Sequence, residues 1–483
     1  MPRPLKGLIP AAGKGSRARP YTQGTHKALL DVSGVPNMER IIGIMRDEMG
    51  ILDVVVVIGH LGDTIRDYFG NGDAFGVRIQ YVENHDLDKG LAWSVLLARP
   101  YLDDYFCMML CDECYLSSNH RELLNVPYRH YLFTCAGLRV DDDTLIKNNY
   151  SIEQESGRLL RLVEKPAAIP NDIMGSGTFI FSPDIFECLQ FAFLVTPQYV
   201  EFVSLLNALL AQEKPGHFFL LSGTYVNIND RDSLALARYH DRDLHFDATK
   251  KTLLIYAEGD ETGILFTVQR YKELGVFNEV CVVLPESSPM LPAVQKSGAR
   301  ALVCPFGIKL YGEKILYAMS QIQTDILVLT EADYSFASRD VSKLFAYLRD
   351  ADMVIGTRTT RQLIEQGSDM RGVVRLAHAF LGLLMGLLWW DREARFTDTG
   401  CSFRAIWGSS LEVIRPHLQE TGPAFSAEMM LACLECRLRV IEVPVSYFNR
   451  SASQNKAYRN KQAFFSFLRL LLKRRITACF RRG

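Results

Sequence analysis

The chain has 483 residues and a mass of 54.6 kDa, with 54 Lys and Arg residues against 55 Asp and Glu residues. Its composition, 48% hydrophobic and 23% charged, is that of an ordinary globular enzyme and excludes both a disordered chain and a basic protein that coats nucleic acid. At about 100 to 200 residues per domain, this length predicts two or three domains, each with its own core.

Short β-rich runs alternate with helical patterns along the whole chain, which predicts strands and helices in turn. The predicted strands of the first half are residues 7–10, 54–59, 79–82 and 106–111. A polar, charged segment at residues 238–251 interrupts the series. The predicted strands of the second half are residues 252–256, 279–284, 301–304, 325–329 and 353–355. We therefore predict an α/β protein with two tandem Rossmann-like domains, each with three α/β/α layers and a mostly parallel sheet.

The end of the chain has a different character. No acidic residue follows Glu442, whereas ten basic residues do, so we predict a basic amphipathic tail at residues 461–483. The polar segment at 238–251 separates a first domain, predicted at residues 1–243, from a second, predicted at 250–460. A basic amphipathic helix fits an anionic membrane surface, although a solvated helix packed on its own domain is the alternative. The longest apolar run, 376–390, is shorter than the roughly 18 to 20 residues that cross a bilayer, so it predicts a core or interfacial helix.

The expected compartment is the cytoplasm, or the inner face of a membrane. Eleven cysteines are scattered along the chain, and no signal peptide pattern precedes the first strand. Reduced thiols are the simpler interpretation. The balanced charge also predicts no nucleic-acid partner.

A loop of small residues follows the first predicted strand. It consists of Ala11, Ala12, Gly13, Lys14 and Gly15, and Arg17 comes two residues later. Small residues let backbone N–H groups approach phosphate oxygens closely, so the loop predicts a nucleotide cradle, with a plain structural turn as the alternative. It matches neither GxxxxGK[ST] nor GxGxxG, which argues against a P-loop hydrolase and a Rossmann dehydrogenase.

Ten residues after Arg17 stands Lys27, within the segment THKALL. The loop and this segment together resemble the sugar-1-phosphate nucleotidyltransferase superfamily, whose signature is a loop ending in GxGxR followed by a PK[PA]LL segment. Here His26 replaces the usual proline. Further matches follow in the family's order over about residues 7–240.

The resemblance implies roles for these further positions. Gly90 and Ala92 lie in a GLA turn similar to the one that reads the nucleobase, and Asp112 ends a strand as the Mg²⁺-binding Asp does. Glu164 and Lys165 match the EKP segment, whose Lys meets the acceptor phosphate. Gly177 matches the strand that lines the acceptor pocket.

The second metal ligand departs from the family's usual Asp. We assign it to Asn227, because an amide oxygen can also bind Mg²⁺, with Asp230 or Asp232 as fallback carboxylates and Mn²⁺ as an alternative ion. The expected partners are a nucleoside triphosphate and a sugar phosphate, or a small phospho-alcohol.

The expected chemistry brings two polyanions together. Catalysis therefore depends on positioning and on charge neutralisation. Arg17 would hold the departing pyrophosphate, and Lys27 and Lys165 would clamp the two reactants.

The second half resembles family-2 glycosyltransferases of the dolichol-phosphate-mannose synthase type over about residues 252–460, which implies a GT-A-like fold. The matching positions, in chain order, are Glu331, Asp333, Arg358, Asp398, Arg404, Glu428 and Arg450. The resemblance implies that Glu331 and Asp333 hold a metal on the donor diphosphate and that Arg404 or Arg450 meets a lipid-phosphate acceptor. Three departures weaken it: the opening reads LIYAEGDE, the strand end that binds the nucleobase reads VLPESS, and the first acid of DxD is Glu331.

We thus predict a bifunctional enzyme. Its first domain makes a nucleotide-activated sugar, and its second domain transfers that sugar to a polyprenyl phosphate or a glycan. The alternative is a cytidylyltransferase for a phospho-alcohol or phosphonate, whose second domain is non-catalytic or only anchors it to a membrane.

Overall fold

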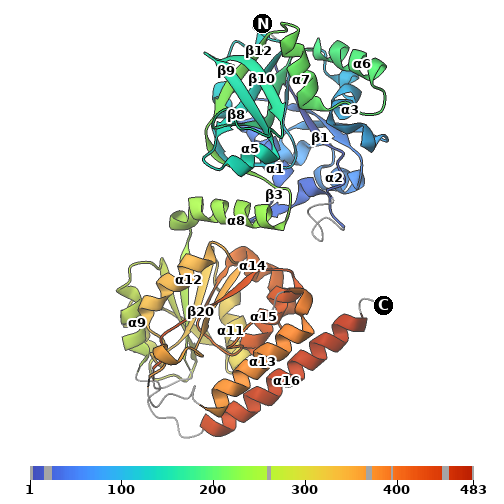
Figure 1. The fold of residues 1–483 in the computed structure, drawn as a ribbon. Helices are drawn as coiled ribbons and strands as arrows, with labels where there is room; N and C mark the ends of the chain where they lie inside the picture. Colours follow the sequence, from blue (N-terminus) through green and yellow to red (C-terminus); the bar gives the residue numbers. More distant parts are fainter. Residues whose placement is uncertain are drawn as a thin grey trace. The chain divides into compact units, whose positions relative to one another are not determined.

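The computed structural model describes residues 4–15, 24–257, 263–365, 372–392, 395–448 and 456–480. The chain divides into two compact units, Met1–Asp241 and Arg242–Gly483, which we call the N-terminal and C-terminal units. Both contain sheets covered by helices, so the α/β class is confirmed (Figure 1). Helix α8 (Arg231–His245) spans the division between the units.

The main sheet of the N-terminal unit has the strand order β5-β4-β1-β6-β11-β8-β12-β10-β9. These strands are β1 (Lys6–Ala11), β4 (Asp53–Ile58), β5 (Arg78–Glu83), β6 (Phe106–Met108), β8 (Phe133–Arg139), β9 (Tyr150–Glu155), β10 (Arg158–Glu164), β11 (Ile173–Phe181) and β12 (Gly216–Leu221). Its helices are α1 (Asn37–Gly43), α2 (Gly62–Phe69), α3 (Gly90–Leu97), α4 (His120–Leu123), α5 (Asp143–Asn148), α6 (Ile185–Val195) and α7 (Phe202–Ala211). Valine-rich β4 is buried along almost its whole length, as a strand with helices on both faces must be.

This sheet is mixed, whereas the sequence predicted a mostly parallel one. Strands β5, β4, β1 and β6 are parallel, but β11 runs antiparallel to both β6 and β8. Strands β9 and β10 form a hairpin through Ser156 and Gly157, which have φ values of 49° and 84°. A two-residue turn with positive φ joins antiparallel neighbours only, whereas a parallel pair needs a long crossover.

A separate two-stranded ladder has polar residues at one end, next to Asp112. Strand β7 (Glu113–Ser118) pairs antiparallel with β13 (Gly223–Asn227), and Asn227 lies opposite Glu113. Beyond the ladder, the Ile228 N–H donates to the Asp112 carbonyl at 2.8 Å. The two chain segments that leave the ladder at this end therefore run next to each other.

The sheet of the C-terminal unit has the order β16-β15-β14-β17-β19-β18-β20, with β19 antiparallel to both its neighbours. These strands are β14 (Lys251–Tyr256), β15 (Glu279–Pro285), β16 (Arg300–Cys304), β17 (Ile326–Glu331), β18 (Met353–Thr357), β19 (Arg404–Trp407) and β20 (Val440–Pro444). Its helices are α9 (Ile264–Lys272), α10 (Leu291–Lys296), α11 (Tyr311–Ser320), α12 (Val341–Leu348), α13 (Val373–Leu388), α14 (Gly408–Ile414), α15 (Phe425–Glu435) and α16 (Lys456–Phe480).

Residues 461–480 of the basic tail lie in α16, which runs alongside α13 (Figure 1). Phe467, Leu470 and Leu471 of α16 are buried in the core of the C-terminal unit. Its Arg474 pairs with Glu428 at 2.5 Å and with Glu435 at 3.0 Å. One face of the tail is thus packed on its own unit. Within the described residues, no helix is both long enough and apolar enough to span a bilayer.

Candidate active site

The glycine loop leaves the end of β1 and opens on a cavity of about 400 Å³. Gly15 has a φ of 57°, in the left-handed region that glycine enters without strain. A side chain at Gly13 would meet no atom within 4 Å, because this face of the loop looks into open space. The loop can therefore bring its backbone close to a ligand. Ala12, Lys14 and Gly15 also line the cavity, whereas Ala11 is buried in the core and Arg17 lies outside the described residues.

Lys27 reaches the same cavity from the short helix η2 (Lys27–Leu29). Its ammonium donates to Asp112 Oδ2 at 2.8 Å and to Asn229 Oδ1 at 3.0 Å. The Lys27 side chain is only 11% exposed. A carboxylate oxygen and an amide oxygen thus converge on one cation at the mouth of the glycine loop.

The amide oxygen belongs to Asn229, not to the residue that the sequence suggested. Asn227 donates its Nδ2 to Asn149 at 3.2 Å, and it does not line the cavity. The fallback Asp230 accepts from the Ser233 N–H at 2.9 Å and caps the start of α8, and Asp232 is exposed on that helix. Of these four side chains, Asn229 is the one whose oxygen shares the Lys27 ammonium with Asp112.

The oxygens of Asp112 and Asn229 suit a divalent cation. Mg²⁺ prefers oxygen ligands and is commonly bound by one or two protein groups together with waters and substrate phosphates. The Lys27 ammonium shows that both oxygens can face one positive charge. Among the described residues there is no group of three or more His, Cys, Asp or Glu side chains arranged around a metal position. The pair therefore fits an ion that substrate helps to hold.

A buried carboxylate lies directly behind this pair. Burial raises the pKa of Glu113 to about 7, although hydrogen bonds from Tyr115, Gly177 and Tyr225 oppose the rise. Its oxygens accept from Tyr115 at 2.5 Å, from the Gly177 N–H at 2.6 Å and from Tyr225 at 3.0 Å. Glu113 thus ties the ladder to β11. Sequence reasoning missed it, although an acid following Asp112 at the start of a buried strand was a usable signal.

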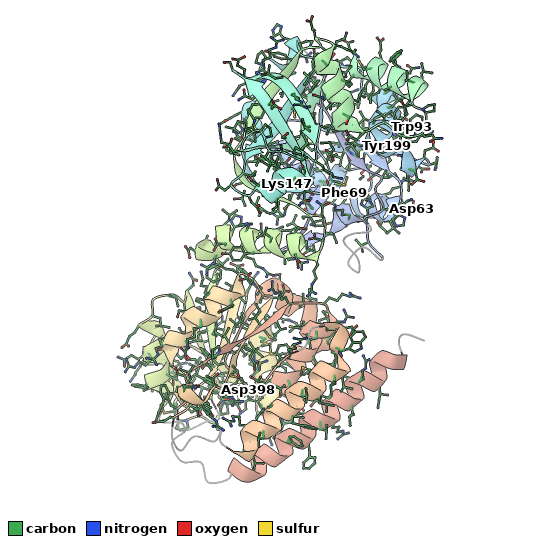
Figure 2. The ribbon with its side chains drawn as sticks, viewed as in Figure 1. Asp63, Phe69, Trp93, Lys147, Tyr199 and Asp398 are labelled. Atoms are coloured by element: carbon green, nitrogen blue, oxygen red, sulfur yellow. The ribbon has the colours of Figure 1, made fainter. Side chains whose placement is uncertain are left out.

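Gly177 is a packing position in this arrangement. A Cβ there would lie 2.4 Å from Leu110 Cγ, so a larger residue would displace the cavity wall. Gly90 has a φ of 82° and lines the cavity, and the ring of Tyr199 lies against it (Tyr199 is labelled in Figure 2). Ala92 is fully buried beneath this turn.

The Glu164 and Lys165 side chains, expected at the acceptor, do not line this cavity. The Lys165 side chain is 69% exposed, and its backbone has a φ of 45°. Its Nζ lies 3.9 Å from Glu164 Oε1. Burial raises the pKa of Glu164, and Glu201 adds to the effect. Neither side chain lines the cavity that holds Lys27.

In the C-terminal unit, the acidic pair at the end of β17 is held by serines. Ser402 Oγ donates to Glu331 Oε1 at 2.6 Å. Asp333 Oδ1 accepts from the Ser335 hydroxyl at 2.7 Å and from the Ser335 N–H at 3.2 Å. These bonds orient both carboxylates at the carboxyl end of the strand.

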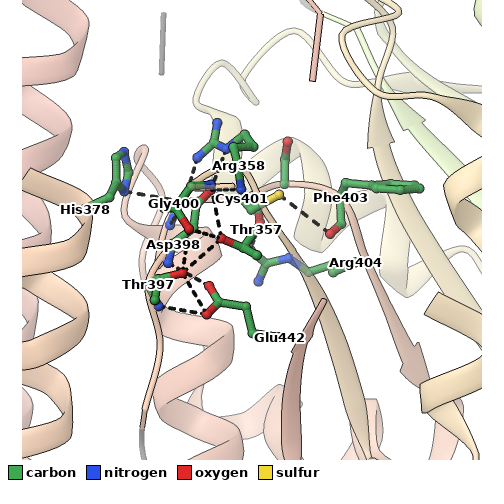
Figure 3. Close-up of polar contacts among 12 residues, drawn as sticks. Thr357, Arg358, His378, Thr397, Asp398, Gly400, Cys401, Phe403, Arg404 and Glu442 are labelled. Atoms are coloured by element: carbon green, nitrogen blue, oxygen red, sulfur yellow. Dashed lines mark hydrogen bonds and ion pairs between the residues drawn. The ribbon is translucent and has the colours of Figure 1, made fainter. Parts of the chain in front are cut away.

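Arg358 and Asp398 form a buried ion pair, shown in Figure 3. Arg358 donates Nε to Asp398 Oδ2 at 2.7 Å and Nη2 to Oδ1 at 2.9 Å. Burial alone would raise the pKa of Asp398, but the guanidinium outweighs it and holds this pKa below its ordinary value. Glu442 accepts from the Thr397 and Asp398 N–H groups at 2.8 and 2.7 Å, which fixes the loop that carries the pair (Figure 3).

Two other expected site residues of this unit bond to its interior. Arg404 is 1% exposed and donates to the carbonyls of Ser426 and Cys401. Glu428 accepts from Arg474 and from two loop N–H groups, at Gln419 and Glu420. Their charged groups are thus directed into the fold. Arg450 lies outside the described residues.

Residues 6–236 match the model of the Nucleotidyl transferase family. The N-terminal part of the chain therefore matches this family. The chain is 31% identical over 202 residues to a glucose-1-phosphate thymidylyltransferase of Streptomyces griseus, a match that covers 40% of this chain and 53% of the relative. It is 28% identical over 204 residues to a UTP–glucose-1-phosphate uridylyltransferase of Synechocystis sp., covering 38% of this chain and 50% of the relative.

The chain thus spans about half the length of these two curated relatives. A solved structure of apo UDP-glucose pyrophosphorylase overlaps 50% of this chain and 100% of its own, with 20% identity and a TM-score of 0.43. The family match and the curated relatives support one enzyme class for the N-terminal unit, that of nucleotidyltransferases of the sugar-phosphate type.

Proposed function

We propose that the N-terminal unit transfers a nucleotidyl group from a nucleoside triphosphate to a sugar-1-phosphate and releases pyrophosphate. The observation that carries this proposal is the convergence of Asp112 and Asn229 on the Lys27 ammonium, beside the glycine loop. The loop offers backbone N–H groups to the triphosphate, and Lys27 supplies positive charge where two polyanions must meet.

In this reaction an oxygen of the acceptor phosphate bonds to the α-phosphorus, and the bond from that phosphorus to the β-phosphate oxygen breaks. The acceptor needs no strong base, because the second pKa of a phosphate is about 6 and the group is largely dianionic at neutral pH. Burial lowers the pKa of His26, in the cavity wall, to about 4, so its imidazole is neutral at pH 7. Arg17 and Lys165 remain our proposed contacts for pyrophosphate and acceptor.

Mg²⁺, or Mn²⁺ in its place, would be held by Asp112 and Asn229 and would neutralise charge on the phosphates. We propose Asn229 in place of Asn227, because only Asn229 shares a cation with Asp112.

The test is pyrophosphate release by the full chain with Mg²⁺. Each of the four nucleoside triphosphates is combined with sugar-1-phosphates, phosphocholine and aminoethylphosphonate. Release that needs a sugar-1-phosphate and is lost in Asp112→Ala supports the proposal. Asp103→Ala is the matched control, because Asp103 pairs with Lys6 on the surface of the same unit and should be dispensable. Release only with CTP and a phospho-alcohol or phosphonate refutes the sugar substrate.

We further propose that the C-terminal unit transfers the sugar from its nucleoside diphosphate to a lipid phosphate at an anionic membrane, with the nucleoside diphosphate as the leaving group. An apolar stripe on α13 supports the membrane part of this proposal, because its side chains are 53 to 81% exposed. The stripe comprises Val373, Leu376, Phe380, Leu383 and Leu387. Adjacent α16 adds exposed Phe465, Leu472 and Ile476 next to basic side chains. Apolar area flanked by cations suits the interface of an anionic bilayer.

Vesicle sedimentation tests the membrane part of this proposal. The full chain should bind vesicles rich in phosphatidylglycerol and not neutral ones, and Leu383→Ser with Leu387→Ser should abolish binding. The control is Phe191→Ser with Leu194→Ser, an equally exposed apolar pair on α6 of the N-terminal unit. Equal binding by both double variants would refute the membrane surface. Glycosyl transfer that survives Glu331→Ala with Asp333→Ala would refute the proposed donor site.

A further inference from the structure

His26 lines the same cavity as the glycine loop and Lys27, the two parts of the site that we propose for the triphosphate. It is 2% exposed and lies in the wall of the same cavity as Gly13 and Lys27. Its Nδ1 accepts from the Ala28 N–H at 3.0 Å and so caps the short helix that begins at Lys27. The imidazole therefore fixes the backbone that presents the Lys27 ammonium.

The other ring nitrogen is a donor. Since Nδ1 accepts a hydrogen bond, it carries no proton, and a neutral imidazole then carries its proton on Nε2. Nε2 is buried and makes no hydrogen bond to any residue that the structure describes. A buried donor without a bond is costly and calls for an explanation.

The group that faces this donor belongs to the glycine loop. Burial lowers the pKa of His26, and the Gly13 backbone is the main-chain group that acts in the opposite direction. A carbonyl has this effect on histidine by accepting from a ring N–H. The Nε2–H therefore faces the Gly13 carbonyl, in a contact that falls short of a well-aligned hydrogen bond.

We propose that His26 is a positioning residue for nucleotidyl transfer: its Nε2–H restrains the glycine loop through the Gly13 carbonyl, while its Nδ1 holds the Lys27 turn. The imidazole thereby couples the loop that receives the triphosphate to the lysine that neutralises it. This inference rests on the proposed function for its kinetic consequences, whereas the restraint on the loop is a property of the protein without substrate.

The two bonds can be separated by substitution. In His26→Asn the side-chain oxygen can still accept from Ala28 as an N-cap, but nothing reaches Gly13. In His26→Gln an amide donor can reach Gly13, but the cap is weakened. The backbone of His26 has φ −63° and ψ 146°, which proline also adopts, so His26→Pro preserves the turn and removes both bonds.

The expected kinetic result is specific to one substrate. His26→Asn and His26→Pro should raise KM for the triphosphate about tenfold, as expected when a buried polar contact is lost, and leave KM for the sugar phosphate unchanged. In His26→Gln, KM for the triphosphate should stay close to the wild-type value. If wild type is active and His26→Asn keeps its triphosphate KM, this inference is overturned and the proposed function stands.

Amide hydrogen exchange without substrate provides a reading that does not depend on activity. In His26→Asn, exchange in a peptide that covers Gly13 and Gly15 should become faster, and in His26→Gln it should not. This result would support the restraint even if wild type released no pyrophosphate with any substrate. Such a lack of activity would refute only the proposed function. Equal exchange in wild type and His26→Asn would overturn the inference.

Discussion

Replacing Lys27 by methionine tests the electrostatic reasoning most directly. The substitution keeps an unbranched side chain that is one atom shorter, and it removes the ammonium that lies 2.8 Å from Asp112 Oδ2 and 3.0 Å from Asn229 Oδ1. At an effective dielectric constant of about 20, two unit charges 4 Å apart interact by about 4 kcal/mol. Loss of one preorganised contact of this kind typically costs about 3 kcal/mol in the transition state, so kcat/KM should fall about a hundredfold or more.

The same variant should alter the response to metal in the opposite direction. The ammonium competes with a divalent cation for Asp112 and Asn229, so its removal should lower the Mg²⁺ concentration that gives half-maximal rate, even as the maximal rate falls. The assay is pyrophosphate release over a Mg²⁺ titration, with the unfolding free energy measured in parallel to exclude a folding defect.

The control is Lys6→Met, which removes an ammonium 2.9 Å from Asp103 at a more exposed place in the same unit. A surface pair contributes less than about 1 kcal/mol, and this one lies outside the cavity wall, so activity should be unchanged. A Lys27→Met protein with the kcat/KM of wild type at saturating Mg²⁺ would refute the role that we give this ammonium.

Three further outcomes follow from the contacts described above. Asn229→Ala should lower activity and raise the Mg²⁺ requirement, whereas Asn227→Ala should leave the Mg²⁺ titration unchanged; the reverse pattern would restore the assignment made from sequence. Arg358→Met leaves the buried carboxylate of Asp398 unpaired, so urea unfolding should show a loss of about 3 to 5 kcal/mol at pH 7. Because the folded pKa of Asp398 is lowered, the stability from this pair is present above about pH 4 and is lost as the pH falls through that lowered pKa, so the variant and wild type should converge in acid. Arg474→Met should speed hydrogen exchange in α16 without affecting the N-terminal unit, and unchanged exchange would show that buried apolar contacts alone hold the helix.

The strands were predictable because their signal is local. The run 7–10 became β1 (Lys6–Ala11), and the run 252–256 became β14 (Lys251–Tyr256). Buried strands need continuous apolar residues wherever they lie in a sheet, so a short window of sequence contains the information. The mixed direction of the first sheet was not predicted, since direction depends on which strands pair over long separations.

The sequence by itself determined the α/β class and placed the glycine loop, Lys27 and Asp112 in the order in which a phosphate site needs them. Tertiary structure decided which side chains meet. Asn227 and Asn229 are two residues apart and chemically identical, and the end of the β7–β13 ladder brings only the second to Lys27. Likewise, an arginine such as Arg404 can face a phosphate or bond two buried carbonyls, and its residue type does not distinguish these outcomes. The choice depends on contacts between residues far apart in the chain, which only packing brings together.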